Sequence, residues 1–138
     1  MQQACEFNNL TKFSVDEEKL LKTVETVLQE EKGEANYSVS LAFVDGEKMR
    51  ELNRIHRGKD YITDVLSFFY NEGGVLGEVV VCPEKVEEDA QEKKISFEER
   101  CLVVTVHGVL HLLGYTHEDD LSENKMEEKT KLYLKKSQ

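Results

Sequence analysis

The chain has 138 residues, with 18 Lys or Arg and 28 Asp or Glu, so its formal net charge is −10. A chain of this length is most simply one domain, which is expected to span residues 1–138. Its 39% hydrophobic and 33% charged residues exclude a disordered chain and a membrane protein. Its three cysteines are odd in number and widely spaced, which argues against a disulfide framework or a cysteine zinc cluster and favours a reducing, cytoplasmic setting.

The beginning of the chain predicts a strand, a helix and a second strand. Residues 5–10 are expected to form the first strand. The helix then starts at a capping-box pair, Ser14 and Glu17, and stops at Gly33. Alternation of larger apolar and smaller residues over 37–43 predicts the second strand.

A helix and a hairpin are expected next. Asp45 can cap a helix that ends near His56 and directs three apolar residues inward. These three are Met49, Leu52 and Ile55. The hairpin has strands at 65–70 and 75–82, joined by a turn at 71–74.

Two further helices follow the hairpin. Pro83 suits the first turn of a helix that reaches about Lys94. The capping-box spacing of Ser96 and Glu99 then opens a buried helix that ends near Gly114.

A last amphipathic helix is expected to start at Asp119 or Asp120. Its apolar residues are Leu121, Met126, Tyr133 and Leu134. The complete order, β-α-β-α-β-β-α-α-α, predicts an α+β fold in which about five helices pack on a small, mixed, four-stranded sheet. The buried helix over 97–113 is expected to lie across this sheet as the central element of the core.

Three of the four histidines, His107, His111 and His117, lie within eleven residues. His107 and His111 are four residues apart, so on a helix they share one face. Gly114 permits the left-handed residue that ends a helix, after which the chain can turn His117 back toward the same point. Three imidazoles can bind one divalent ion and leave a coordination position open for water or substrate. The pattern therefore predicts a metal site carried by the central helix.

The alternative is that these histidines are ordinary core residues. Burying two unpaired imidazoles is costly, however, and a shared metal offsets that cost. The protease motif H-E-x-x-H would need a glutamate where this chain has Gly108, which disfavours a conventional zinc protease. Gly108 leaves room either for a bulky substrate or for close backbone packing.

A basic segment over residues 48–59 contains five Lys or Arg and one acid, so it carries +4 in an otherwise acidic chain. Within it, Arg57 precedes Gly58 and can project from a loop. A guanidinium there can bind phosphate in a forked geometry and stabilise charge that develops on it. The alternative, favoured for Lys48, Arg50 and Lys59, is a solvated helix face.

Three polar residues, Thr63, Asp64 and Ser67, lie at the start of the predicted hairpin. They are either turn-forming residues or partners that orient an imidazole. The sequence leaves both interpretations open.

The stretches Asn53–Phe68 and His107–His117 together resemble the YbeY family of bacterial rRNA maturation factors, which are metal-dependent, single-strand endoribonucleases. Weaker support comes from Gly77–Cys82, and the resemblance extends over nearly the whole chain. This chain departs from the family pattern at four positions. Ile62 and Phe69 stand where proline is usual, and Glu78 and Thr116 stand where aspartate is usual. Neighbouring Glu118 or Asp119 could replace the last of these aspartates.

The resemblance implies that His107, His111 and His117 bind one Zn²⁺, or another divalent transition metal, and that Arg57 is the catalytic arginine. The activity implied is that of a cytoplasmic, zinc-dependent hydrolase: an endoribonuclease that matures the 3′ end of small-subunit rRNA and acts in ribosome quality control. Its partners would be rRNA and the small ribosomal subunit, and no membrane.

In the implied mechanism the metal polarises water or a phosphate oxygen, and Arg57 holds the scissile phosphate. The basic segment would guide the RNA backbone, with Arg50, Arg54 and Lys59 as the weaker candidates for contact. Two alternatives remain open. One is a non-enzymatic, ribosome-associated factor with a structural metal, which would need a fourth protein ligand. The other is a metallohydrolase of another substrate class, such as peptides, which would need a carboxylate base from elsewhere in the fold.

Overall fold

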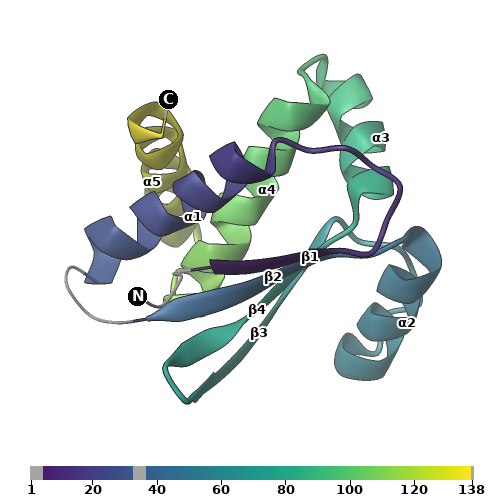
Figure 1. Cartoon of the computed structure of the whole chain (residues 1–138), viewed down its shortest axis with the longest axis horizontal. Coiled ribbons are helices and arrows are strands. Elements are labelled where there is room, and N and C mark those ends of the chain that lie inside the picture. Colours follow the sequence, from purple (N-terminus) through teal and green to yellow (C-terminus); the bar gives the residue numbers. More distant parts are fainter. Residues whose placement is uncertain (1–4, 33–36, 138) are drawn as a thin grey trace.

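The computed structural model describes residues 5–32 and 37–137, and the order of their helices and strands is the predicted one (Figure 1). In chain order the elements are β1 (Cys5–Asn9), α1 (Glu17–Lys32), β2 (Ser38–Phe43), α2 (Gly46–Arg57), β3 (Val65–Glu72), β4 (Val75–Val81), α3 (Pro83–Lys93), α4 (Phe97–Leu112) and α5 (Asp120–Lys136). The predicted α+β fold, with a mixed four-stranded sheet and five helices in the described part of the chain, is confirmed.

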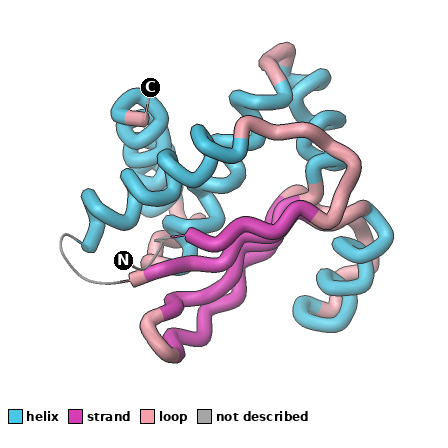
Figure 2. The backbone as a smooth tube through the Cα atoms, viewed as in Figure 1, coloured by secondary structure: helices cyan, strands magenta, loops and turns pink. Residues whose placement is uncertain are grey.

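The sheet has the strand order β1-β2-β4-β3. Strands β1, β2 and β4 run parallel, and β3 is antiparallel to β4, its partner in the hairpin. Strand β3 is therefore an edge strand. Helix α2 lies on one side of the sheet, and helices α1, α4 and α5 lie on the other (Figure 2).

Helix α4 is the central element of the main core, as predicted. Val104, Val106, Val109 and Leu110 are fully buried on it, in one hydrophobic cluster with residues of β1, β2, β4, α1 and α5. A smaller cluster on the opposite side of the sheet contains Met49 of α2. No helix in the described part of the chain is both long enough and apolar enough to cross a membrane.

Gly108 allows α4 to approach the sheet closely. A Cβ at this position would lie 2.5 Å from Val79 Cγ1 and 3.2 Å from Val65 Cγ2. The Ser67 hydroxyl on β3 donates a hydrogen bond to the Gly108 carbonyl at 2.8 Å. Of the two interpretations of this glycine, close packing is the one supported, because the space beside it is filled by strand side chains.

Side-chain caps fix the starts of several helices. Asp45 and Ser96 accept hydrogen bonds from the backbone three residues later, as predicted. Asp119 rather than Asp120 caps α5. The prediction for α1 was wrong, because Asp16 rather than Ser14 accepts from the Lys19 amide, at 3.1 Å. The predicted stop at Gly33 lies outside the described residues.

Two apolar residues predicted to face inward are instead exposed. Ile55 is 57% exposed, because steps of three residues drift around a helix by about 60° each. The buried face of α2 instead includes Met49 and Asn53, which are four residues apart. Leu121 is 83% exposed, since it lies off the face of α5 that Met126 and Tyr133 bury.

We predict that Gly108→Ala lowers the free energy of unfolding by about 1–3 kcal/mol, because the added methyl group would overlap Val79. Alanine is the better helix former by about 1 kcal/mol, so a net loss would come from this contact. The measurement is urea unfolding followed by circular dichroism. The control is the same substitution in a Val79→Ala background, where its cost should be smaller. Equal costs in both backgrounds would contradict the prediction.

Candidate functional site

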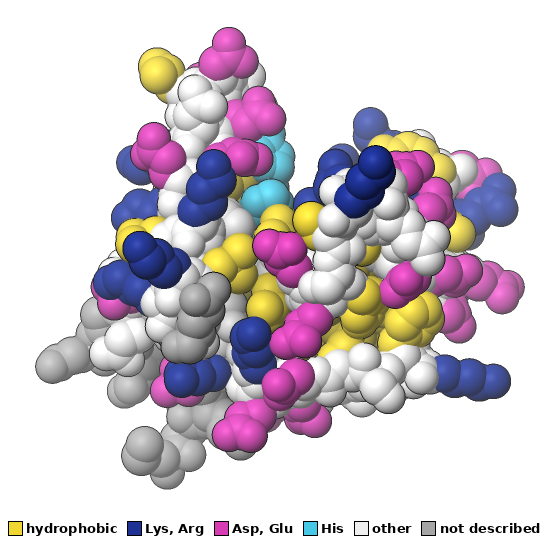
Figure 3. All heavy atoms as spheres, turned by 90° about the horizontal axis from the view of Figure 1, so that it is seen from above, with side chains coloured by type: hydrophobic (Ala, Val, Ile, Leu, Met, Phe, Trp, Pro, Cys, Tyr) yellow, Lys and Arg dark blue, Asp and Glu magenta, His cyan; other side chains and the backbone are white. Residues whose placement is uncertain are grey.

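A surface hollow of about 620 Å³ lies where the end of α2, strand β3 and the end of α4 meet. Arg57, Asp64, Phe69, His111 and His117 are among the residues that line it. Figure 3 shows histidine side chains in a recess between two raised parts of the surface. The hollow thus brings together residues from the two sequence stretches that carry the predicted chemistry.

The three clustered histidines approach one another at one end of α4. His111 and His117 have ring centroids 4.7 Å apart, and those of His107 and His117 are 6.1 Å apart. His117 lies on the segment between α4 and α5, so the chain does turn back toward the helix. Among the described residues, however, no group of three His, Cys, Asp or Glu side chains is arranged to hold a metal ion. Their role as ligands therefore stays a prediction.

Backbone geometry after α4 produces this turn. Gly114 has φ +102°, in the region that favours glycine, and its amide donates to the His111 carbonyl at 3.1 Å. The Tyr115 amide donates to the Leu110 carbonyl at 3.0 Å. These bonds close the end of the helix and reverse the chain before His117.

His111 is oriented by a backbone carbonyl. Its Nδ1 lies 3.0 Å from the Tyr115 carbonyl oxygen, which can only accept, so Nδ1 carries the proton. Its Nε2 is then left with a free lone pair, which is the arrangement usual for a metal-binding histidine. No local sequence pattern indicates this partner, because the bond depends on the turn at Gly114.

Burial keeps two of these imidazoles neutral. Burial lowers the pKa of His107, and the charge of nearby His117 adds to this effect. Burial is also the main cause of the lowered pKa of His111, with smaller contributions from His117 and Arg57. Neutral imidazole is the form that binds a metal ion.

A carboxylate from α1 holds the turn that follows α4. The Tyr115 hydroxyl donates to Glu31 Oε1 at 2.8 Å, and the Tyr133 hydroxyl on α5 makes a short hydrogen bond to Glu31 Oε2. Lys129 Nζ lies 3.4 Å from the same carboxylate, whose side chain is only 13% exposed. The peptide segment that carries His117 is thus tied to α1, which is far from it in sequence, and through the same carboxylate to α5.

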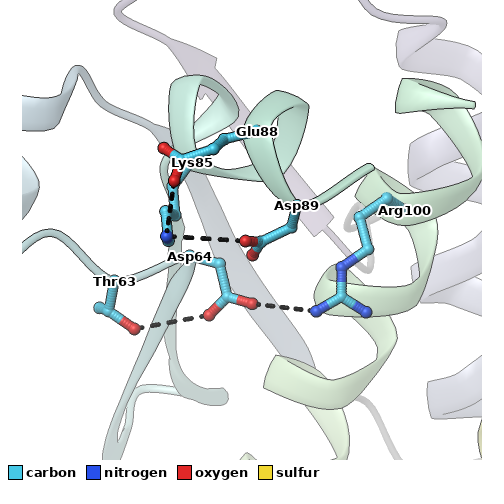
Figure 4. Close-up of polar contacts among 6 residues, drawn as sticks. All are labelled: Thr63, Asp64, Lys85, Glu88, Asp89 and Arg100. Carbon is cyan, nitrogen blue, oxygen red and sulfur yellow. Dashed lines mark hydrogen bonds and ion pairs between the residues drawn. The ribbon is translucent and has the colours of Figure 1, made fainter. Parts of the chain in front are cut away.

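The polar residues at the start of the hairpin do not orient an imidazole in the described structure. Ser67 bonds to Gly108, as described above, and the Thr63 hydroxyl donates to Asp64 Oδ1 at 3.5 Å. Asp64 Oδ2 lies 3.4 Å from Nη2 of Arg100 on α4 (Figure 4). Ser67 and Asp64 thus bond to α4, and Thr63 bonds to Asp64, so the described structure does not support these residues as imidazole partners.

Arg100 is a residue near the histidines that was not predicted. It lies seven residues before His107, which places both on one face of α4, and this spacing was the available signal. Its side chain is 16% exposed, and its Nε is buried without a hydrogen-bond partner in the described structure. Arg100 does not line the hollow, but its charge lies near enough to His107 to help lower the pKa of that imidazole.

Arg57 is the last residue of α2 and is exposed where it lines the hollow. The helix ends because Gly58 adopts φ +68°, as the sequence suggested.

The other basic candidates, Arg50, Arg54 and Lys59, do not line the hollow. Arg50 is paired with Asp60 at 2.7 Å. Of this set, the structure brings only Arg57 to the histidines.

The three cysteines are buried, and Asp119 caps a helix. Cys5, Cys82 and Cys101 are buried and free, and burial raises the pKa of Cys5 and Cys101 to about 12. Such thiols remain protonated. Asp119, one of the two candidates to replace the missing aspartate, is occupied as the cap of α5, where it accepts from the Ser122 amide at 2.8 Å.

Comparison with known proteins connects this site to a family. The family model described as endoribonuclease YbeY matches residues 6–138. The chain belongs to the endoribonuclease YbeY family. An endoribonuclease YbeY from Thermotoga sp. (strain RQ2) is 42% identical over 118 residues, which cover 85% of this chain and 77% of that protein. Its counterpart from Chlorobium phaeovibrioides is 40% identical over 131 residues, covering 94% and 88%.

A solved structure of related sequence shares this fold. The solution structure of a Thermotoga maritima protein superimposes with a TM-score of 0.72 at 38% sequence identity. The match covers 96% of this chain and 88% of that one. The fold described above is therefore shared with a protein of related sequence.

We predict that Glu31→Gln destabilises the protein at neutral pH but much less in acid. Burial alone would raise the pKa of Glu31, but bonds from Tyr133 and Tyr115 and the charge of Lys129 hold it below its ordinary value of 4.5. A carboxylate with a lowered pKa stabilises the fold above its ordinary value and loses that effect as the pH falls through the folded-state pKa. The expected loss at pH 7 is about 1–3 kcal/mol, measured by urea unfolding.

The control is Glu30→Gln. Glu30 is the preceding residue, 42% exposed, and pairs with Lys136 at 2.9 Å. Such an exposed pair contributes little, so this variant should unfold like the wild type. A Glu31→Gln effect that is equally large at pH 7 and at pH 3 would contradict the prediction.

Proposed function

We propose that this chain is a metal-dependent endoribonuclease that cleaves single-stranded RNA and acts in maturation of the 3′ end of small-subunit rRNA. The observation that carries this proposal is the hollow that His111, His117 and Arg57 line together, in a member of the endoribonuclease YbeY family. Imidazoles beside a guanidinium suit phosphate chemistry rather than peptide chemistry. A role in ribosome quality control belongs to the same proposal.

The residues of the site fit a divalent transition metal. His107, His111 and His117 would hold it, with Zn²⁺ as the first choice, because two of these imidazoles are kept neutral by burial and the Nε2 of His111 is free. A bound ion would supply a Lewis acid that polarises a water or a phosphate oxygen. A structural metal would need a fourth protein ligand, and the buried thiols do not offer one.

Arg57 acts on the phosphate in this proposal. Its exposed guanidinium can make two parallel hydrogen bonds to the non-bridging oxygens of the scissile phosphate. It would stabilise the negative charge that grows on them as the bond breaks. Arg100 is only half-buried but less available, because Asp64 already pairs with it.

We further propose that residues 1–138 form a single domain that works in the cytoplasm, with rRNA of the small ribosomal subunit as its partner. One hydrophobic cluster includes residues from Cys5 on β1 to Tyr133 on α5, which supports a single folding unit. The buried, unpaired cysteines are consistent with a reducing compartment.

The metal assignment is tested by metal analysis of natively purified variants. His107→Ala, His111→Ala and His117→Ala should each contain far less than one ion per chain, because a site with three ligands has none to spare. The matched control is His56→Ala, since His56 also lines the hollow but packs edge-on against Phe68, with ring centroids 4.9 Å apart. Equal metal content in all four variants would overturn the assignment.

The role of Arg57 is tested by RNA cleavage under single-turnover conditions. Arg57→Ala should cleave about 10²–10³-fold more slowly, because one positioned charge at the phosphate is lost. Metal content and melting temperature should stay near those of the wild type, since the side chain is exposed. Arg57→Lys should restore cleavage only in part, because a point charge cannot make the forked contact.

The matched control for Arg57 is Arg50→Ala. Arg50 lies on the same helix, is exposed, and is already paired with Asp60. Its loss should change the cleavage rate little. A wild-type rate for Arg57→Ala would mean that Arg57 is an ordinary surface charge and that the phosphate-binding role is wrong.

A further inference from the structure

Phe69 is an exposed aromatic side chain beside the candidate site. It is 63% exposed, and it lines the hollow together with Arg57, His111 and His117. It lies on β3 two residues after Ser67, whose side chain bonds to α4, so alternation along the strand directs Phe69 to the same face of the sheet. An apolar ring thus lies next to the proposed phosphate-binding groups.

The fold leaves this ring uncovered in the described part of the chain. Its partner in register on β4 is Gly77, which has no side chain. A Cβ at Gly77 would overlap the Phe68 carbonyl oxygen on β3 and lie 2.9 Å from Leu112 Cδ2, so the close approach of β3 and α4 keeps this position free of a larger residue. On its other side β3 is the edge of the sheet. The ring therefore has no cross-strand side chain to pack against.

An uncovered aromatic face beside a cation matches the chemistry of unpaired nucleotides. Proteins bind single-stranded RNA by stacking bases on aromatic rings while cations contact the backbone. In a duplex the bases are already stacked on one another, so a lone ring favours a strand whose bases are free. An apolar protein partner fits less well, because the ring opens into a hollow shared with Arg57 and two histidines.

We propose that Phe69 stacks on the nucleobase beside the phosphate that Arg57 holds, and that this contact makes the site selective for single-stranded RNA. This inference rests on the proposed endoribonuclease function. It adds a binding subsite for a base, whereas Arg57 and the histidines address the phosphate. Any of the four bases can occupy the subsite, because each presents a flat π face.

The test compares two neighbouring residues on the same strand. Tyr70 follows Phe69 and is 48% exposed, but it does not line the hollow, so Tyr70→Ala is the matched control for Phe69→Ala. Phe69→Tyr keeps a ring and should behave like the wild type. The substrates are short, unstructured RNA oligonucleotides in which one nucleotide at a time is made abasic. The readouts are kcat and KM for cleavage with metal present.

Loss of the ring should raise KM about 5- to 100-fold and leave kcat nearly unchanged. In the wild type and in Tyr70→Ala, one abasic position next to the cleaved bond should raise KM by a similar factor. In Phe69→Ala the same abasic position should have no further effect, because the stacking partner is already gone. A 2-aminopurine base at that position should lose fluorescence on binding to the wild type but not to Phe69→Ala.

Several results would overturn the inference. One is wild-type KM in Phe69→Ala, and another is an equal effect of Tyr70→Ala. A third is a change in sedimentation on loss of Phe69, which would make the ring a contact between copies of the chain. If the wild type cleaves RNA while any of these holds, the subsite is wrong and the endoribonuclease proposal stands. If the metal-loaded wild type does not cleave RNA, the proposed function fails and the subsite with it.

Discussion

The contact between Gly108 and the hairpin determines where the candidate site can form. Helix α4 lies so close to β3 and β4 at this point that a single added methyl group would overlap Val79. The Ser67 hydroxyl fixes the same spot by bonding to the Gly108 carbonyl. Because His107 precedes Gly108 and His111 follows it by less than one turn, the helix–sheet distance also sets how far both imidazoles lie from β3. One small residue therefore serves the packing of the core and the geometry of the site.

The third histidine depends on a different set of contacts. The turn at Gly114 brings His117 back toward α4, and Tyr115 connects that turn to Glu31 on α1. Tyr133 of α5 bonds to the same carboxylate. This carboxylate accepts hydrogen bonds from two hydroxyl groups and faces a lysine. It holds these partners firmly, because leaving any of the polar groups unpaired would cost free energy. Helices α1 and α5 thus help to position the loop that carries His117.

Local sequence signals were sufficient for the order of elements and for most helix starts. The side-chain caps at Asp45 and Ser96, and the spacing of His107 and His111 on one helical face, are properties of short segments. The rest of the site depends on tertiary contacts that leave no local pattern: Glu31 and Tyr115 are 84 residues apart, and Asp64 and Arg100 are 36 apart. Ile55 is a different case, because its exposure follows from the drift of three-residue steps around a helix, which is a local property.

The distribution of charge favours recognition at short range. The basic segment carries +4 with Glu51 already counted, and it is further neutralised in the fold because Arg50 pairs with Asp60, just outside the segment. The whole chain has a net charge of −10, so its surface does not attract RNA from a distance. Charges in solution are screened beyond about 8 Å at physiological salt. An RNA strand would therefore gain its binding energy inside the hollow, from a phosphate at Arg57 and a base at Phe69. A strand in a duplex cannot offer a phosphate to Arg57 and an unstacked base to Phe69 at the same time. An acidic protein that binds RNA only through these short-range contacts would therefore prefer unpaired RNA.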